Sequence, residues 1–169
     1  YDCKIGPDET VGEVHDKLMV LGSELVVNTV EAIFENNVEF RPQKSFIQGS
    51  EILKPAPKLS RELCHIDWRS STKDIYNLIR GLSPYPAAFT ELVKEDKTLQ
   101  MKIYRTAKVT GEEYETMLAA NGFEKAEPGT VLSDGKTYLA IAAADGAISV
   151  TEIQLAGKKR MAVKDFLIG

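Results

Sequence analysis

The sequence of 169 residues has few of the residue types that mark disulfide, metal or membrane proteins. Its two cysteines, Cys3 and Cys64, are too few for a disulfide framework and lack the Cys-x-x-Cys spacing of a metal or redox pair. No apolar run approaches the roughly 20 residues that span a bilayer, since the longest, 139–144, is alanine-rich and strand-sized. No basic and apolar leader is visible, so no signal peptide is expected. We therefore expect reduced thiols, no contact with a membrane and a cytoplasmic location.

Residues that perform acid–base or nucleophilic chemistry are also scarce. The sequence has two histidines, and His15 lies beside Asp16 on a predicted solvated helix, where it is expected to be a surface residue. Asp145 and Gly146 are expected to form a turn, because no second carboxylate stands at the spacing of a calcium ligand set. No Ser/His/Asp, Cys/His or metal-ligand constellation is present, so we predict no catalytic residue and no metal site in this chain.

The charges are unevenly distributed along the chain, although the formal net charge is only −4. Residues 1–41 contain nine acidic and three basic side chains and carry −6, whereas residues 42–84 contain seven basic and four acidic ones and carry +3. A second basic cluster, Lys158-Lys159-Arg160, lies near the C-terminus. Because charge is screened within about 10 Å, a polyanion site requires these two basic regions to share one face.

Residues 10–34 have the pattern of a long amphipathic helix. Thr10 can cap this helix, and Glu13 three residues later completes a capping box. One helix and a short strand fragment cannot bury their own apolar face, so this segment is expected to need a partner. The apolar face comprises Val14, Leu18, Leu21, Leu25, Val26, Thr29, Val30 and Ile33.

Residues 65–89 contain a second amphipathic helix followed by a stiff turn. Ser70, Ser71 and Thr72 offer oxygens that can cap the helix, and an apolar face follows at helical spacing. The helix is expected to end at residue 83, because the residue before a proline is pushed toward extended geometry. Pro84 and Pro86 then hold Tyr85 in an extended turn. The apolar face of the helix comprises Ile75, Leu78, Ile79 and Leu82.

After this turn the apolar period changes from that of a helix to that of a strand. The pattern predicts five strands and one inserted helix in about 85 residues, which fits a small barrel of the oligonucleotide-binding (OB) type better than a sandwich. The fold class is therefore α+β and mainly β, an OB-like barrel preceded by a linker helix and by the helix at 10–34. The predicted strands are 89–93, 99–109, 130–133, 137–143 and 147–155, and the inserted helix is 110–121.

The long strand at 99–109 has an apolar and a polar face. Arg105 breaks the apolar parity and indicates either a bulge or a strand edge. The polar face is either a solvated sheet face or a basic face with one aromatic that contacts RNA. The apolar parity comprises Met101, Ile103, Ala107 and Val109, and the polar parity comprises Lys102, Tyr104, Thr106 and Lys108.

Three short motifs stand out, Ile66-Asp67-Trp68, Ile79-Arg80 and Pro84-Tyr85-Pro86-Ala87-Ala88. Together they closely resemble the start of the C-terminal domain of methionyl-tRNA formyltransferases. That family usually has Pro-Trp-Pro, and Tyr85 keeps an aromatic face at the same place. For Asp67, Trp68 and Arg80 we favour a structural role, with Trp68 buried at a domain junction and Asp67 paired to a cation or capping the helix.

The resemblance implies a division of the chain into three parts. Residues 1–41 would be the end of a catalytic domain, residues 42–64 a basic linker, and residues 65–169 an OB-like tRNA-binding domain. The family's catalytic residues lie upstream of the matching region, so this chain alone is expected to be inactive. The implied parent enzyme formylates the methionyl group of initiator tRNA with 10-formyltetrahydrofolate as co-substrate. Initiator methionyl-tRNA is the expected partner, and no cofactor is expected to bind this chain.

The candidate tRNA-binding residues are cations in three regions of the chain. Three adjacent cations on a loop repel one another unless water or an anion compensates them, so the loop that follows Gly157 favours phosphate contacts, with a merely solubilising loop as the alternative. The linker cations either contact RNA phosphates or belong to a solvated tether. The candidates are Lys158, Lys159, Arg160, Lys102, Lys108, Lys54 and Lys58.

Two other function classes stay open. The first is the C-terminal module of a nucleotide-sugar formyltransferase or a formyl-folate hydrolase, which would not bind tRNA. The second is a non-catalytic barrel that binds protein, which would expose an apolar patch. Self-association through the helix at 10–34 is also expected, because its apolar face lacks a partner.

Overall fold

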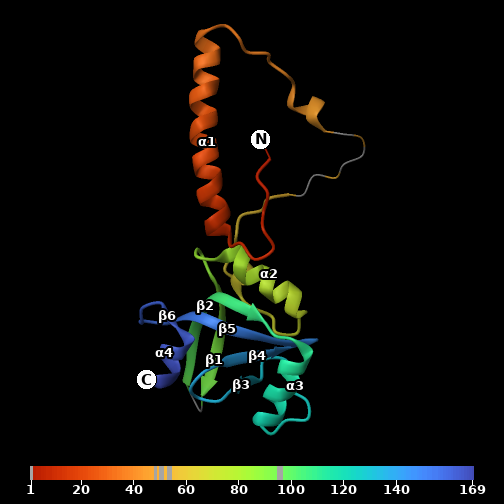
Figure 1. Ribbon diagram of the computed structural model, residues 1–169, viewed down its shortest axis with the longest axis vertical. Helices are drawn as coiled ribbons and strands as arrows, with labels where there is room; N and C mark the ends of the chain where they lie inside the picture. The colour runs from red at the N-terminus through yellow and green to blue at the C-terminus, as the bar shows by residue number, and fades with distance from the viewer. Residues whose placement is uncertain (1, 48, 50–51, 53–54, 95–96) are drawn as a thin grey trace.

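Six strands of the described residues form one antiparallel sheet that curls around a core (Figure 1). The structure, a computed structural model, describes residues 2–47, 49, 52, 55–94 and 97–169. The order across the sheet is β1-β2-β5-β4-β3, and β6 pairs with β5. The strands are β1 (Ala88–Lys94), β2 (Lys97–Lys108), β3 (Val131–Ser133), β4 (Leu139–Ala143), β5 (Gly146–Leu155) and β6 (Met161–Ala162).

The predicted strands are confirmed, each within two residues of its expected ends. The mixed α and β class with a curled antiparallel sheet is confirmed as well. Among the described residues the pairing runs as an open path from β1 to β3. A short helix, α4 (Val163–Ile168), follows β6 and contacts β5 and β6.

Helix α2 (Thr72–Leu82) packs its apolar face on the sheet. The Ser71 hydroxyl caps it by accepting the Asp74 amide at 3.1 Å, and the carboxylate of Asp145 accepts the Thr72 amide at 2.7 Å. Both contacts satisfy amides that a helix leaves unpaired at its start. The face that α2 buries comprises Ile75, Ile79 and Leu82, which join a core with residues such as Met101, Ile103, Ile148 and Ile153.

A smaller apolar cluster lies under the inserted helix, α3 (Gly111–Ala120), which connects β2 to β3. Thr110 and Glu113 form a capping box at its start. Short 3-10 turns, η1 (Gln43–Phe46) and η2 (Glu62–Cys64), lie in the segment between α1 and α2. The cluster comprises Leu118, Ala126, Leu132, Ala140, Ala142 and Ala147.

The prediction for the polar face of β2 is wrong at Tyr104. The register shifts on both sides of Arg105, which favours the bulge over the strand edge as the reason for the break in parity. A bulge changes which side chains face the core, and Tyr104 is only 7% exposed while Ala107 is exposed. The Tyr104 side chain is therefore buried in the domain and is not an exposed aromatic beside the lysines.

Helix α1 (Val11–Phe34) projects away from the sheet, as Figure 1 shows. The capping box of Thr10 and Glu13 is confirmed. None of its residues is buried, and its apolar side chains are exposed. No helix of the described residues is long and apolar enough to cross a membrane. The exposed apolar residues include Leu18, Leu21, Leu25, Val26, Val30 and Ile33.

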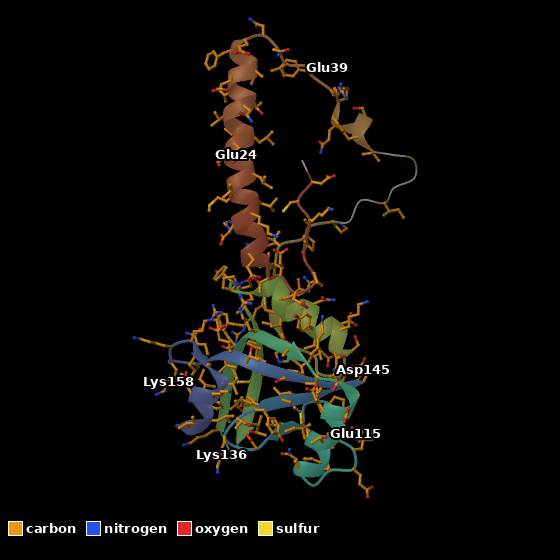
Figure 2. All side chains as sticks on the ribbon, in the orientation of Figure 1. Glu24, Glu39, Glu115, Lys136, Asp145 and Lys158 are labelled. Carbon is orange, nitrogen blue, oxygen red and sulfur yellow. The ribbon has the colours of Figure 1, made fainter. Side chains whose placement is uncertain are left out.

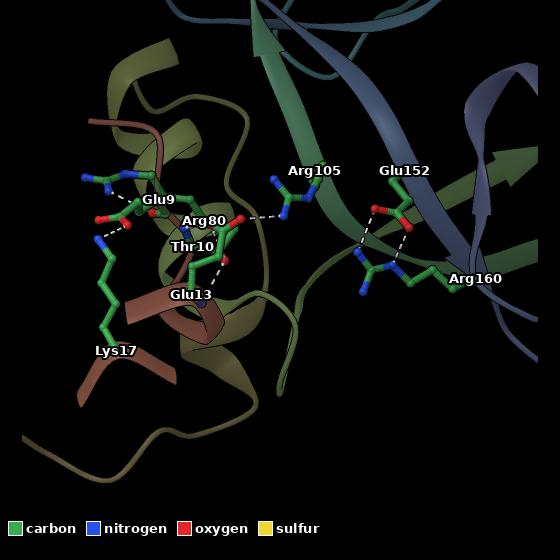
Figure 3. A network of polar contacts seen from close by, with 8 residues as sticks. All are labelled: Glu9, Thr10, Glu13, Lys17, Arg80, Arg105, Glu152 and Arg160. Carbon is green, nitrogen blue, oxygen red and sulfur yellow. Dashed lines mark hydrogen bonds and ion pairs between the residues drawn. The ribbon is translucent and has the colours of Figure 1, made fainter. Parts of the chain in front are cut away.

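Polar contacts join the start of α1 to the sheet (Figure 3). Arg105 donates to the Glu13 carboxylate at 2.8 Å, and Arg80 donates to the Glu9 carbonyl at 3.1 Å. The Gly12 amide donates to the Ser83 carbonyl at 3.0 Å. A Cβ on Gly12 would lie 2.5 Å from Pro84 Cδ, so the helix approaches the turn as closely as a glycine allows.

The contact between Glu13 and the sheet should depend on pH. Backbone and hydroxyl donors of Thr10, together with Arg105, lower the pKa of Glu13 from 4.5 to about 2. Because the folded pKa is the lower one, the stabilisation is complete above about pH 4.5 and is lost as the pH falls toward about 2. The chemical shift of the Gly12 amide should follow this titration. Glu13→Gln should abolish it, whereas Glu24→Gln, a change on the exposed part of α1, should not. An unchanged titration in Glu13→Gln would contradict the assignment.

Candidate nucleic-acid interface

Two shallow grooves meet at Lys102 on β2. One, of about 300 Å³, is lined by Arg61 on the segment before η2, by Pro86 in the α2–β1 turn and by Gln100. The other, of about 230 Å³, is lined by Gln154 and by the turn between β5 and β6. Lys102 belongs to both grooves and donates from Nζ to the Pro86 carbonyl at 3.2 Å. The β2 lysine, the segment before η2 and the base of the C-terminal basic loop are thus adjacent.

The loop that carries Lys158 and Lys159 is well ordered by hydrogen bonds at its base. The Lys158 amide donates to the Leu155 carbonyl at 3.0 Å, and its carbonyl accepts from Gln154 Nε2 at 2.9 Å. Gly157 has a φ of 75°, a region that favours glycine. Both lysine side chains are exposed, and Figure 2 shows Lys158 projecting from one side of the domain. Within the described parts of the chain, neither lysine side chain forms an ion pair, so both ammonium groups are available to an anion.

Arg160 differs from its two neighbours because it already has an anionic partner. Its guanidinium donates to both carboxylate oxygens of Glu152, at 2.5 and 2.6 Å (Figure 3). It also lies over the ring of Tyr104, with Cζ 4.3 Å from the centroid. The hydrogen bonds that Arg160 donates to Glu152 raise the pKa of Arg160. Its charge is therefore compensated within the sheet, so it binds phosphate only by competing with Glu152.

Lys108 lies at the far end of β2 from the grooves. Lys108 is six positions further along β2 than Lys102. Six positions along a strand correspond to about 20 Å. The Nζ of Lys108 contacts the Asp8 carboxylate at 3.0 Å and lies 4.7 Å from the ring centroid of Tyr76. Tyr76 also donates its hydroxyl to Asp8 at 2.9 Å. Lys108 and then Tyr76 lower the pKa of Asp8, so this lysine belongs to the contact between α1 and the sheet.

The linker candidates are described only in part. Lys54 lies outside the described residues, and Lys58 is exposed three residues before Arg61. Arg61 was not among the predicted site residues, although it belongs to the same basic segment. It lines the first groove, and its Cζ lies 5.5 Å from the ring centroid of Phe89. Phe89 lies on β1, which follows α2 in the chain. The contact between Arg61 and Phe89 therefore has no local pattern in the sequence from which it could be predicted.

The residues of the three short motifs have structural contacts. Asp67 pairs with Arg69 at 2.9 Å and accepts the Arg69 amide at 3.1 Å. Trp68 is half-buried, and its Nε1 donates to the Thr90 hydroxyl at 3.0 Å. Trp68 therefore holds the segment before α2 to β1. Arg80, whose Nε also donates to Asn77 Oδ1 at 2.8 Å, is the motif residue that contacts the segment before α1.

No group of three potential metal ligands occurs in the described parts of the chain. The exposed lysines beside the grooves are suited to anion binding, since ammonium groups donate to phosphate oxygens. The site is therefore suited to holding a polyanion in position.

The sheet, α2 and the turn between α2 and β1 all lie within residues 58–169. Residues 58–169 match the family described as "Formyl transferase, C-terminal domain", and the chain belongs to this family. The fold agrees with that of HypX from Aquifex aeolicus in complex with tetrahydrofolic acid, at a TM-score of 0.57 and 18% identity over 86% of this chain and 22% of HypX.

Within this family the chain is similar to methionyl-tRNA formyltransferases. It is 48% identical over 166 residues to the one from Phocaeicola vulgatus, which covers 98% of this chain and 48% of that protein. It is 41% identical over 166 residues to the one from Parabacteroides distasonis, with the same coverage. The chain spans about half the length of the curated relatives it matches.

Proposed function

We propose that this chain is the tRNA-binding part of a methionyl-tRNA formyltransferase. The parent reaction would transfer a formyl group from 10-formyltetrahydrofolate to the amino group of methionine on initiator tRNA. The observation that carries the proposal is the similarity over nearly the whole chain to proteins of that name. The exposed lysines beside the two grooves supply the physical means, because cations on one face attract a phosphate backbone.

The proposed role of this part is to hold and orient the RNA. Holding two reactants in place lowers the entropic cost of reaction without any proton transfer. Residues 1–41 would belong to the catalytic half, residues 42–64 would be the linker, and residues 65–169 would be the OB-like RNA-binding domain. The chain alone should be inactive, and the parent enzyme should act in the cytoplasm. Mixing the chain with 10-formyltetrahydrofolate and methionyl-tRNA should therefore yield no formylated product.

The affinity of the chain for initiator tRNA, measured against salt concentration, tests the proposal. We expect binding at low salt that weakens as salt rises, by about 0.9 unit of log affinity per log unit of salt for each phosphate contacted in duplex regions. An absence of binding at low salt would reject the RNA-binding role of this chain. It would then favour a module of an enzyme that acts on nucleotide sugars or formyl-folate.

The exposed apolar side chains of α1 support a second proposal, association with another copy of the chain. A helix with this much exposed apolar surface gains free energy when a second apolar face covers it. Sedimentation at two protein concentrations that showed only monomer would reject it.

A further inference from the structure

The turn between α2 and β1 presents an aromatic ring to solvent beside the lysine grooves. Tyr85 is 83% exposed, whereas Ser83 and Ala87 on either side are 2% and 1% exposed. Large aromatic side chains usually bury most of their surface. An exposed ring between two buried positions is therefore a candidate contact for a ligand.

The backbone on both sides of Tyr85 is fixed in place. The Ser83 carbonyl accepts the Gly12 amide at 3.0 Å, and the Ala87 amide donates to the Leu82 carbonyl at 2.9 Å. Ala87 has a φ of 72°, which a residue with a Cβ adopts only where its surroundings enforce it. The flanking prolines restrict φ on both sides of the ring. Binding a ligand at Tyr85 would therefore cost little backbone entropy.

The charged surroundings of the turn indicate the chemistry of the ligand. Pro86, next to Tyr85 in sequence, accepts the hydrogen bond from Lys102 Nζ and lines the first groove with Arg61. The second groove continues from Lys102 to the loop at Gly157. An exposed aromatic at the end of a row of cations is the arrangement that binds unpaired nucleotides, since bases stack on the ring and phosphates pair with the cations.

We propose that Tyr85 is a stacking platform for an unpaired base of the bound RNA. The inference rests on the proposed function and adds a requirement for a single-stranded nucleotide next to the phosphates held by Lys102. Stacking is sequence-tolerant, because every base has a π-face. Tyr85 would therefore contribute affinity for an RNA end or loop without reading its sequence.

Two RNA probes separate this contact from the phosphate contacts. One is a short hairpin with a single-stranded 3′ end, and the other is the same hairpin with a blunt end. Tyr85→Ala should weaken binding to the first probe by about 5- to 150-fold, the range that corresponds to stacking of one base. It should leave the blunt probe and the salt slope unchanged, because no phosphate contact is lost. Tyr85→Trp should retain the affinity.

The control is Phe123→Ala, which removes another ring, 40% exposed, in the turn after α3. It should change the affinity for neither probe. If the unchanged chain binds the first probe and Tyr85→Ala binds it equally well, the inference is overturned, and a protein surface becomes the better occupant of the ring. If the unchanged chain binds neither probe, the proposed function fails and this inference fails with it. Circular dichroism of each variant verifies the fold.

Discussion

Replacing both Lys158 and Lys159 by alanine should weaken binding to initiator tRNA by up to about 60-fold at about 0.1 M salt. Both side chains are exposed on a loop whose base is held by hydrogen bonds, so their loss should not disturb the sheet. If each lysine contacts one duplex phosphate, the log–log salt slope should flatten by up to about two units. Fluorescence titration at several salt concentrations measures both quantities.

The matched control removes two other exposed lysines, Lys125 and Lys136. The change in net charge is the same, but Lys136 lies on a different side of the domain from Lys158 (Figure 2). The control should lower affinity only slightly, through the weaker overall field. Equal losses in the two double variants would show that net charge, and not the loop, determines the affinity.

Replacing Arg160 by alanine should give the opposite pattern, a loss of stability with little change in salt slope. The side chain is paired with Glu152 through two hydrogen bonds and covers the ring of Tyr104. A surface ion pair contributes about 0–1 kcal/mol, and a cation–π contact at an exposed site about 0.5–1 kcal/mol. We therefore expect the free energy of unfolding to fall by about 0.5–2 kcal/mol, as measured by urea denaturation.

A second variant tests the same assignment from the anionic side. Glu152→Gln removes the compensating carboxylate, so Arg160 becomes available to phosphate. The affinity for tRNA should rise, and the salt slope should steepen by up to about one unit. If Arg160→Ala flattens the slope as much as Lys159→Ala does, Arg160 binds RNA in spite of Glu152, and the distinction between the three cations is wrong.

The elements of this fold could be predicted because their signals are local. Capping residues such as Thr10 and Ser71 act within three residues of the amides they satisfy. Alternation along β2 and β5 follows from the pleat and needs no knowledge of the partner strand. The turn after α2 is determined by its prolines alone.

The parts that could not be predicted depend on contacts across the sheet. Arg160 and Glu152 are eight residues apart, and only the β5–β6 pairing brings them together. Tyr104 changed face because the register shifts beside Arg105 interrupt the period of two. The sequence indicated a bulge or a strand edge at Arg105 without its effect on the preceding side chain. Lys108 contacts Asp8, which lies 100 residues earlier in the chain, in the segment before α1. No local sequence pattern predicts this contact.

Helix α1 is attached to the rest of the domain mainly at its start, through the hydrogen bonds of Glu13, Gly12 and the Glu9 carbonyl. The helix has 24 residues, so it extends for about 36 Å. A rotation of about 10° at the contacts of Glu13, Gly12 and Arg80 would displace its far end by about 6 Å. A small change in the geometry of these hydrogen bonds therefore produces a large displacement at the far end of the helix. The geometry of these hydrogen bonds therefore determines the orientation, relative to the lysine grooves, of any structure that packs on α1.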